Sequence, residues 1–124
     1  VDLIQKPDSC ILLAREDTAL MACAHIEKHG NYAYFGMFSV SPNQQARGIG
    51  KALLQECETR ASARWQVSEM CMNVIWSRSE LIAFYLRHGY RKTGERKPFP
   101  YGDERFGIPK REDLWFEVLA KPLQ

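Results

Sequence analysis

The middle of the chain constrains the fold most, because a strand, a glycine-containing loop, a helix and a second strand follow one another there. Aromatic and β-branched residues predict the first strand over Tyr32–Val40, and the second is predicted over Met70–Trp76. Between them, apolar residues at steps of four predict a helix from about Gly50 to Trp65. This order predicts a crossover between two parallel strands. Ligands bind at the carboxyl ends of strands joined in this way, so we expect a site where Tyr32–Val40 ends.

Further strands flank this unit on both sides. Before it, strands are predicted over Cys10–Arg15 and Ala19–Glu27. Joined by polar turns, they predict an antiparallel meander whose third strand is Tyr32–Val40. After it, two more strands are predicted over Tyr90–Lys97 and Leu114–Lys121. We therefore expect an α/β fold of the α+β type, with a mixed, mostly antiparallel sheet and one parallel β-α-β crossover. A chain of 124 residues has room for one domain, residues 1–124.

Three local patterns give finer expectations. The stretch Ser77-Arg78-Ser79-Glu80 fits a capping box, so a second helix is predicted to begin near Ser77. A cation followed by glycine predicts its end at Arg87-His88, before Gly89. Along the third strand, alternation places four side chains in phase on one face: Tyr32, Tyr34, Phe38 and Val40.

Composition restricts the class of protein. The chain has 17 basic and 15 acidic residues, and a net charge of +2 does not by itself indicate a nucleic-acid-binding protein. No apolar run approaches the roughly 20 residues of a membrane helix. The four cysteines, Cys10, Cys23, Cys57 and Cys71, form no CxxC pair and lie in apolar stretches, so we expect buried reduced thiols, no metal site and a cytoplasmic protein.

The loop after the third strand carries the main functional signal. Glycines at the start of a helix let the backbone approach a ligand and leave the first amides of the helix pointing outward. Those amides and the helix dipole favour an anion, and Arg47 and Lys51 add positive charge. A Walker A loop is excluded because Gln45 replaces its first glycine and Ala52 its hydroxyl residue. A dinucleotide fingerprint is excluded because Leu53 replaces its last glycine.

What remains is the pattern Gln45-Ala46-Arg47-Gly48-Ile49-Gly50, directly after the end of a strand. It resembles the acyl-CoA pyrophosphate loop of the GNAT superfamily of N-acetyltransferases. The segment Leu81-Ile82-Ala83-Phe84-Tyr85-Leu86-Arg87-His88-Gly89-Tyr90 is similar to a second motif of that family, and the two occur in the family's order.

The resemblance implies a GNAT-like acyl-CoA N-acyltransferase fold and transfer of an acetyl group from acetyl-CoA to a primary amine by direct attack in a ternary complex. It implies that Tyr85 is the general acid that protonates the departing CoA thiolate. The candidate acceptor-binding residues, which are also the candidates for receiving the amine's proton, are Glu27, Asp103 and Glu104. The residues expected to bind acetyl-CoA are Phe38, Val40, Gln45, Ala46, Arg47, Gly48, Ile49, Gly50, Lys51, Asn73 and Ser77.

Simpler interpretations stay open beside this one. Tyr85 could be only a core aromatic residue, and Glu27 and the pair Asp103-Glu104 could be solvated charges. A protein of this fold could also be a non-catalytic acyl-CoA-binding module. A third alternative is a polyanion binder that uses the basic residues Arg47, Lys51, Arg87, Arg91, Lys92, Arg96 and Lys97.

The segment before Cys10 is short for the family, which opens with a strand and one or two helices. Only Val1–Ser9 stands there, so we expect the usual first strand and helices to be lacking. A sheet without its edge strand exposes unpaired amides, which favours association with a second copy as a homodimer.

Overall fold

The computed structural model describes residues 2–16, 19–41, 48–98 and 114–123. The strands are hydrogen bonded in the order β1-β2-β3-β4-β5-β7-β6. The chain divides into two compact units, residues 1–71 with 122–124 and residues 72–121. The elements are β1 (Asp2–Lys6), β2 (Ser9–Glu16), β3 (Ala19–His29), β4 (Tyr32–Val40), α1 (Ile49–Trp65), β5 (Glu69–Ile75), α2 (Ser79–Arg87), β6 (Arg91–Pro98) and β7 (Trp115–Pro122).

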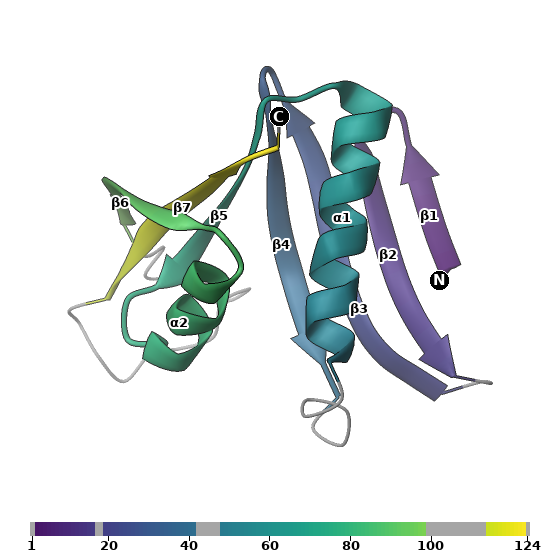
Figure 1. Cartoon of the computed structure of the whole chain (residues 1–124), viewed down its shortest axis with the longest axis horizontal. Coiled ribbons are helices and arrows are strands. Elements are labelled where there is room, and N and C mark those ends of the chain that lie inside the picture. The colour runs from purple at the N-terminus through teal and green to yellow at the C-terminus, as the bar shows by residue number, and fades with distance from the viewer. Residues whose placement is uncertain (1, 17–18, 42–47, 99–113, 124) are drawn as a thin grey trace. The chain divides into compact units, whose positions relative to one another are not determined.

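In the first unit, β1 to β4 form an antiparallel sheet and α1 lies across one face of it (Figure 1). Apolar side chains on the facing surfaces are excluded from water, and this burial is the main source of the unit's stability. The unit thus has its own hydrophobic core, whose largest fully buried side chains include Leu12, Ile26, Phe35, Leu54 and Cys57.

The end of α1 is anchored to the turn between β1 and β2. The indole N–H of Trp65 donates a hydrogen bond to the carbonyl of Pro7 at 3.1 Å, and Arg64 donates one to the carbonyl of Lys6 at 2.7 Å. These bonds fix the direction in which α1 crosses the sheet, and therefore also the position of its first turn.

The predicted crossover is present. Strand β5 pairs in parallel with β4, with Tyr32 opposite Glu69, Ala33 opposite Met70 and Tyr34 opposite Cys71. The chain thus leaves β4, forms α1 and returns as a parallel neighbour. The loop between β4 and α1 consequently follows the carboxyl end of a strand, as expected for a ligand site.

The second unit contains the end of β5, helix α2 and the antiparallel pair of β6 and β7. Ile82 and Tyr85 of α2 are buried, as are Val74 of β5 and Leu119 of β7. Helix α2 ends as predicted, since Gly89 has a φ of +96° and the ring of His88 lies 2.7 Å from the carbonyl of Phe84. Glycine takes this left-handed conformation without a Cβ penalty.

The chain also forms a strand that its sequence did not reveal. Residues Asp2–Lys6 pair with β2 in an antiparallel register that runs from Asp2–Leu13 to Lys6–Ser9. A first strand is therefore present where we expected a gap, joined to β2 by a turn at Pro7-Asp8. Five residues give too little alternation to be recognised alone, and the strand depends on its pairing with β2.

The expectation that Tyr32, Tyr34, Phe38 and Val40 share one face of β4 is wrong. The register of β3 with β4 shifts between Cys23 and His25, which leaves one extra residue in β4, a β-bulge. An extra residue moves every later side chain to the other face. Tyr34 thus lies opposite Glu27, whereas Val40 lies opposite the buried residue Ala22.

The predicted capping box at the start of α2 is also wrong. The helix begins at Ser79, its N-cap residue is Arg78, and no side chain caps it. The amide of Arg78 instead donates to the carbonyl of Ile75 at 3.0 Å, which closes a tight turn over Trp76-Ser77. This turn competes with the capping geometry and leaves Ser77 exposed.

Candidate active site

The first turn of α1 has the properties of an anion site. Gly48 is its N-cap residue with a φ of +76°, no side chain of the described residues caps the helix, and its first turn has no acidic residue. Ile49 and Gly50 are half-buried, and Lys51 is exposed in the same turn. The first amides of a helix have no partner within the helix, so their N–H groups and the positive end of the dipole favour a phosphate.

Space is available beside this turn. A Cβ at Gly48 would meet no atom within 4 Å, so the backbone there is open to a ligand in the described part of the chain. The predicted cofactor-binding residues Gln45, Ala46 and Arg47 lie outside the described residues.

The bulge in β4 lies upstream of this turn. Met37 has a φ of +53°, its side chain is 68% exposed, and its carbonyl accepts a hydrogen bond from the thiol of Cys23 at 3.6 Å. Beyond the bulge, Phe38 and Val40 are half-buried, and the ring of Phe38 lies 5.3 Å from that of Phe35. Bulges occur frequently next to active sites, where they re-aim the strand. The bulge was not predicted from the sequence, although a glycine inside a strand, here Gly36, is the usual signal of a bulge.

Tyr85 lies in the second unit and is only 3% exposed. Its ring packs edge-on against Phe84 at 5.5 Å and against Tyr90 at 5.8 Å between centroids. These contacts hold the ring in one orientation, as both a core aromatic residue and a positioned proton donor require. Of the polar residues predicted nearby, Asn73 is half-buried on β5 and Ser77 is exposed in the following turn.

Glu27 belongs to a titratable cluster on the face of the first sheet opposite the buried side chains of β3. Its carboxylate lies 2.8 Å from Nε2 of His29 and 4.0 Å from Nε2 of His25. It pairs across the strands with Tyr34, which also pairs with Cys71 of β5. The structure therefore places Glu27 beside the point where β4 joins β5. The other two predicted carboxylates, Asp103 and Glu104, lie outside the described residues.

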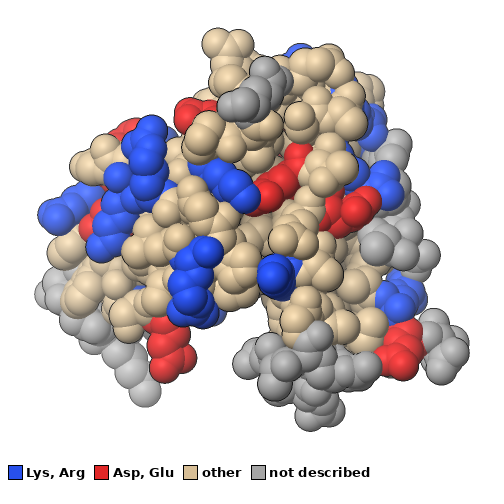
Figure 2. Space-filling view, viewed as in Figure 1, with Lys and Arg blue, Asp and Glu red and all other residues tan. Residues whose placement is uncertain are grey.

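The basic residues that favour a polyanion binder are accompanied by acidic ones. All of β6 is exposed, and within it Lys97 lies 3.7 Å from Glu95. Figure 2 shows lysine and arginine side chains gathered with acidic ones at the left, where β6 lies in Figure 1. Mixed charges of this kind weaken the attraction of a surface for a polyanion.

The cysteines are free thiols, and burial raises the pKa of Cys10 and raises the pKa of Cys57 to about 12. Both therefore stay protonated at neutral pH and behave as apolar core residues. Among the residues that the structure describes, no group of three or more metal-ligating side chains comes together, and no helix is long and apolar enough to cross a membrane.

Comparison with known proteins identifies the family. A model of the GNAT acetyltransferase domain matches residues 7–92, more than half of the chain. The chain belongs to the GNAT acetyltransferase family. A search of curated proteins finds no match. Membership confirms the resemblance seen in the sequence motifs and supports acetyl transfer from acetyl-CoA, with acetyl-CoA as co-substrate.

Solved structures confirm the expected fold. The chain is similar to a nourseothricin acetyltransferase, with 20% identity over 95% of this chain and 67% of that one and a TM-score of 0.81. It is similar to the ribosomal-protein-S18-alanine N-acetyltransferase from Escherichia coli, with 19% identity over 97% and 72% of the two chains and a TM-score of 0.76. A GNAT family acetyltransferase from Elizabethkingia anophelis with acetyl-CoA bound shares 17% identity over 93% and 76%, with a TM-score of 0.79.

Proposed function

We propose that this GNAT family member transfers the acetyl group of acetyl-CoA to a primary amine by direct attack within a ternary complex. The observation that carries the proposal is the uncapped first turn of α1, which follows β4 in a chain that matches the family. Its open glycine and outward amides suit the diphosphate of coenzyme A.

The donor would bind along the first unit. The pyrophosphate rests on the amides of residues 45–51, and the positive charges of Arg47 and Lys51 attract it. The pantetheine arm extends along the end of β4 near Phe38 and Val40, where backbone groups pair with its amides as an added strand would. The exposed bulge at Met37 supports this placement, because a bulge turns backbone groups of a strand away from their ladder.

The chemistry needs one proton donor and one proton acceptor. The amine nitrogen attacks the carbonyl carbon of the thioester, the carbon–sulfur bond breaks, and the thiolate takes the hydroxyl proton of Tyr85. The amine's own proton leaves to water or to a carboxylate, for which Glu27, Asp103 and Glu104 are the candidates. Asn73 and Ser77 add polar contacts to the donor.

Replacing Tyr85 by phenylalanine tests the mechanism. Tyr85→Phe removes one oxygen and keeps the ring, so turnover should fall about 10–100-fold while the Kd for acetyl-CoA stays unchanged. Release of CoA is measured with a thiol reagent in the presence of a panel of amines. Tyr90→Phe is the matched control, because Tyr90 is equally buried and its ring packs against that of Tyr85.

Two outcomes contradict the proposal. Unchanged turnover in Tyr85→Phe would assign the proton transfer to water or another group. Binding of acetyl-CoA without any amine-stimulated release of CoA would make the protein an acyl-CoA-binding module instead.

We also propose that the protein acts in the cytoplasm as a homodimer. β1 is the first strand in the sheet order and offers an edge for pairing with a second copy. Sedimentation at micromolar concentration tests the assembly, and a monomer there would refute it.

A further inference from the structure

A cavity of about 410 Å³ lies in the first unit, between the last turns of α1 and the strands β2 and β3 (Figure 1). Its lining residues are Cys10 of β2, Ile26 of β3, and Arg60, Ala63 and Arg64 of α1. Small-molecule sites in proteins have volumes of about 300–1,000 Å³, so this cavity has room for a small ligand.

The wall that the sheet contributes to this cavity is apolar. Cys10 and Ile26 are directly opposite each other in the β2–β3 ladder, and their exposed fractions are 2% and 0%. Because a polar group placed against such a wall loses its hydrogen bonds to water, a ligand that reaches the wall needs an apolar part.

The wall that α1 contributes is positively charged. Arg60 and Arg64 are four residues apart, so they are neighbours on one face of the helix. Burial is the largest influence on the pKa of the Cys10 thiol and raises it, and the charges of Arg64 and Arg60 oppose this rise. Both guanidinium groups therefore stand close enough to the apolar wall to act on a single ligand.

Both guanidinium groups keep N–H groups for a ligand. Nε of Arg60 donates to Oε1 of Glu56 at 2.8 Å, and Nη2 of Arg64 donates to the carbonyl of Lys6 at 2.7 Å. A guanidinium has five N–H donors, and neither group makes another hydrogen bond with the described residues. Arg60, Arg64 and Glu56 together carry one net positive charge, which is complementary to a ligand with a single negative charge.

The cavity is separate from the proposed acyl-CoA site. Arg60 and Arg64 lie about 15 and 21 Å along the helix axis from Gly50, at 1.5 Å per residue. A diphosphate on the first turn of α1 therefore leaves this cavity open to a second ligand.

We propose that this cavity binds a monocarboxylate with an apolar chain. The carboxylate pairs with Arg60 and Arg64, since guanidinium groups bind carboxylates through charge-assisted N–H donors. The chain lies against Cys10 and Ile26. Because this ligand contacts both α1 and the sheet, its binding stabilises the first unit.

The test uses octanoate as the probe, with 1-octanol and acetate as counterparts that lack the charge and the chain. Binding is followed through the indole N–H resonance of Trp65, assigned by Trp65→Phe, because this ring lies 5.8 Å from the guanidinium carbon of Arg64. Octanoate should shift this resonance and raise Tm, whereas 1-octanol and acetate should each bind at least about fivefold more weakly.

Three variants separate the contributions to binding. Arg60→Gln should weaken octanoate binding about fivefold, whereas Glu56→Gln should strengthen it about twofold because it releases Arg60. Ala63→Leu should weaken binding at least about tenfold, since the larger side chain fills the cavity without changing its charge. Arg87→Gln is the matched control, because it removes the same charge from an exposed position on α2.

Opposite effects of Arg60→Gln and Glu56→Gln would distinguish recognition from a structural role, because both substitutions break the same ion pair. The inference is overturned if octanoate and 1-octanol bind equally, or if Arg60→Gln and Arg87→Gln have the same affinity for octanoate. It is also overturned if acetyl-CoA displaces octanoate, because the probe would then occupy the acyl-CoA site. A protein that binds octanoate but no acetyl-CoA would refute the proposed function alone.

Discussion

Gly48 offers the sharpest test of the phosphate site, because the chain contains a matched glycine elsewhere. Gly48 has a φ of +76° and Gly30, in the β3–β4 turn, has a φ of +60°, and a Cβ at either would meet no atom within 4 Å. Alanine at either position therefore costs only the strain of the left-handed conformation, about 1–2 kcal/mol. For a chain of this size that lowers Tm by roughly 3–8 °C.

Only the substitution at Gly48 should affect the ligand. If the diphosphate lies on the first amides of α1, a methyl group there blocks its approach, and the Kd for acetyl-CoA should rise at least about tenfold, or 1.4 kcal/mol. Gly30→Ala should lower Tm by a similar amount and leave this Kd within about twofold, a change below 0.5 kcal/mol. Calorimetric titration with acetyl-CoA and thermal unfolding measure both quantities. Equal affinities in the two variants would refute the assignment of the phosphate to this turn.

Three further predictions follow from particular side chains. Lys51→Gln should weaken acetyl-CoA binding only about two- to fivefold, with the difference vanishing at high salt, because Lys51 is exposed; titrations at two salt concentrations check this. Leu54→Ala should lower the free energy of unfolding by about 2–5 kcal/mol, measured by urea unfolding, because Leu54 is fully buried. Burial raises the pKa of Cys57 from 9.0 to about 12, so the unfolded chain loses this proton first. Stability should therefore fall as the pH rises above 9, with Cys57 contributing about 1.4 kcal/mol per pH unit. Cys57→Ala should remove that contribution and leave the smaller one of Cys10, whose pKa burial also raises.

The helices and most strands could be predicted from the sequence because local pattern and tertiary packing agree in them. The stripe of Leu53, Cys57 and Ala61 predicts the face of α1 that is in fact buried. Gly89 marks the end of α2 because a left-handed residue is needed there. Strand β4 was predicted with its observed bounds, Tyr32–Val40, because its residues favour extended backbone on either face.

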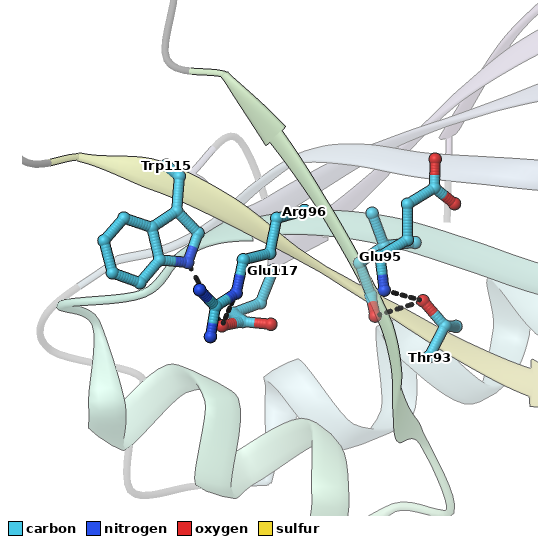
Figure 3. Close-up of polar contacts among 6 residues, drawn as sticks. Thr93, Glu95, Arg96, Trp115 and Glu117 are labelled. Atoms are coloured by element: carbon cyan, nitrogen blue, oxygen red, sulfur yellow. Dashed lines mark hydrogen bonds and ion pairs between the residues drawn. The ribbon is translucent and has the colours of Figure 1, made fainter.

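The features that escaped prediction depend on partners far away in the chain. The bulge in β4 is defined by its register with β3, and Gly36 is its only local sign in the sequence. Strand β1 is defined by its pairing with β2 and has no local pattern of its own. Glu117 of β7 contacts Trp115 of the same strand and Arg96 of β6 (Figure 3), and Trp115 stacks on Trp76 in the turn after β5. Apolar residues stand on both faces of β7, so alternation does not decide the burial of Glu117, and only the structure shows that it is buried.

The bulge changes which face of the sheet the side chains of β4 point to. Before the bulge, Tyr34 faces the same side as Glu27; after it, Val40 faces the buried side with Ala22. Without the extra residue, Val40 would face away from the buried side of the sheet. The amide of Ser41 then donates to the carbonyl of Met21 at 2.8 Å, which extends the ladder to the last described residue before the loop. The bulge in β4 thus turns Phe38 and Val40 to the buried side of the sheet, whereas Tyr32 and Tyr34 face the other side.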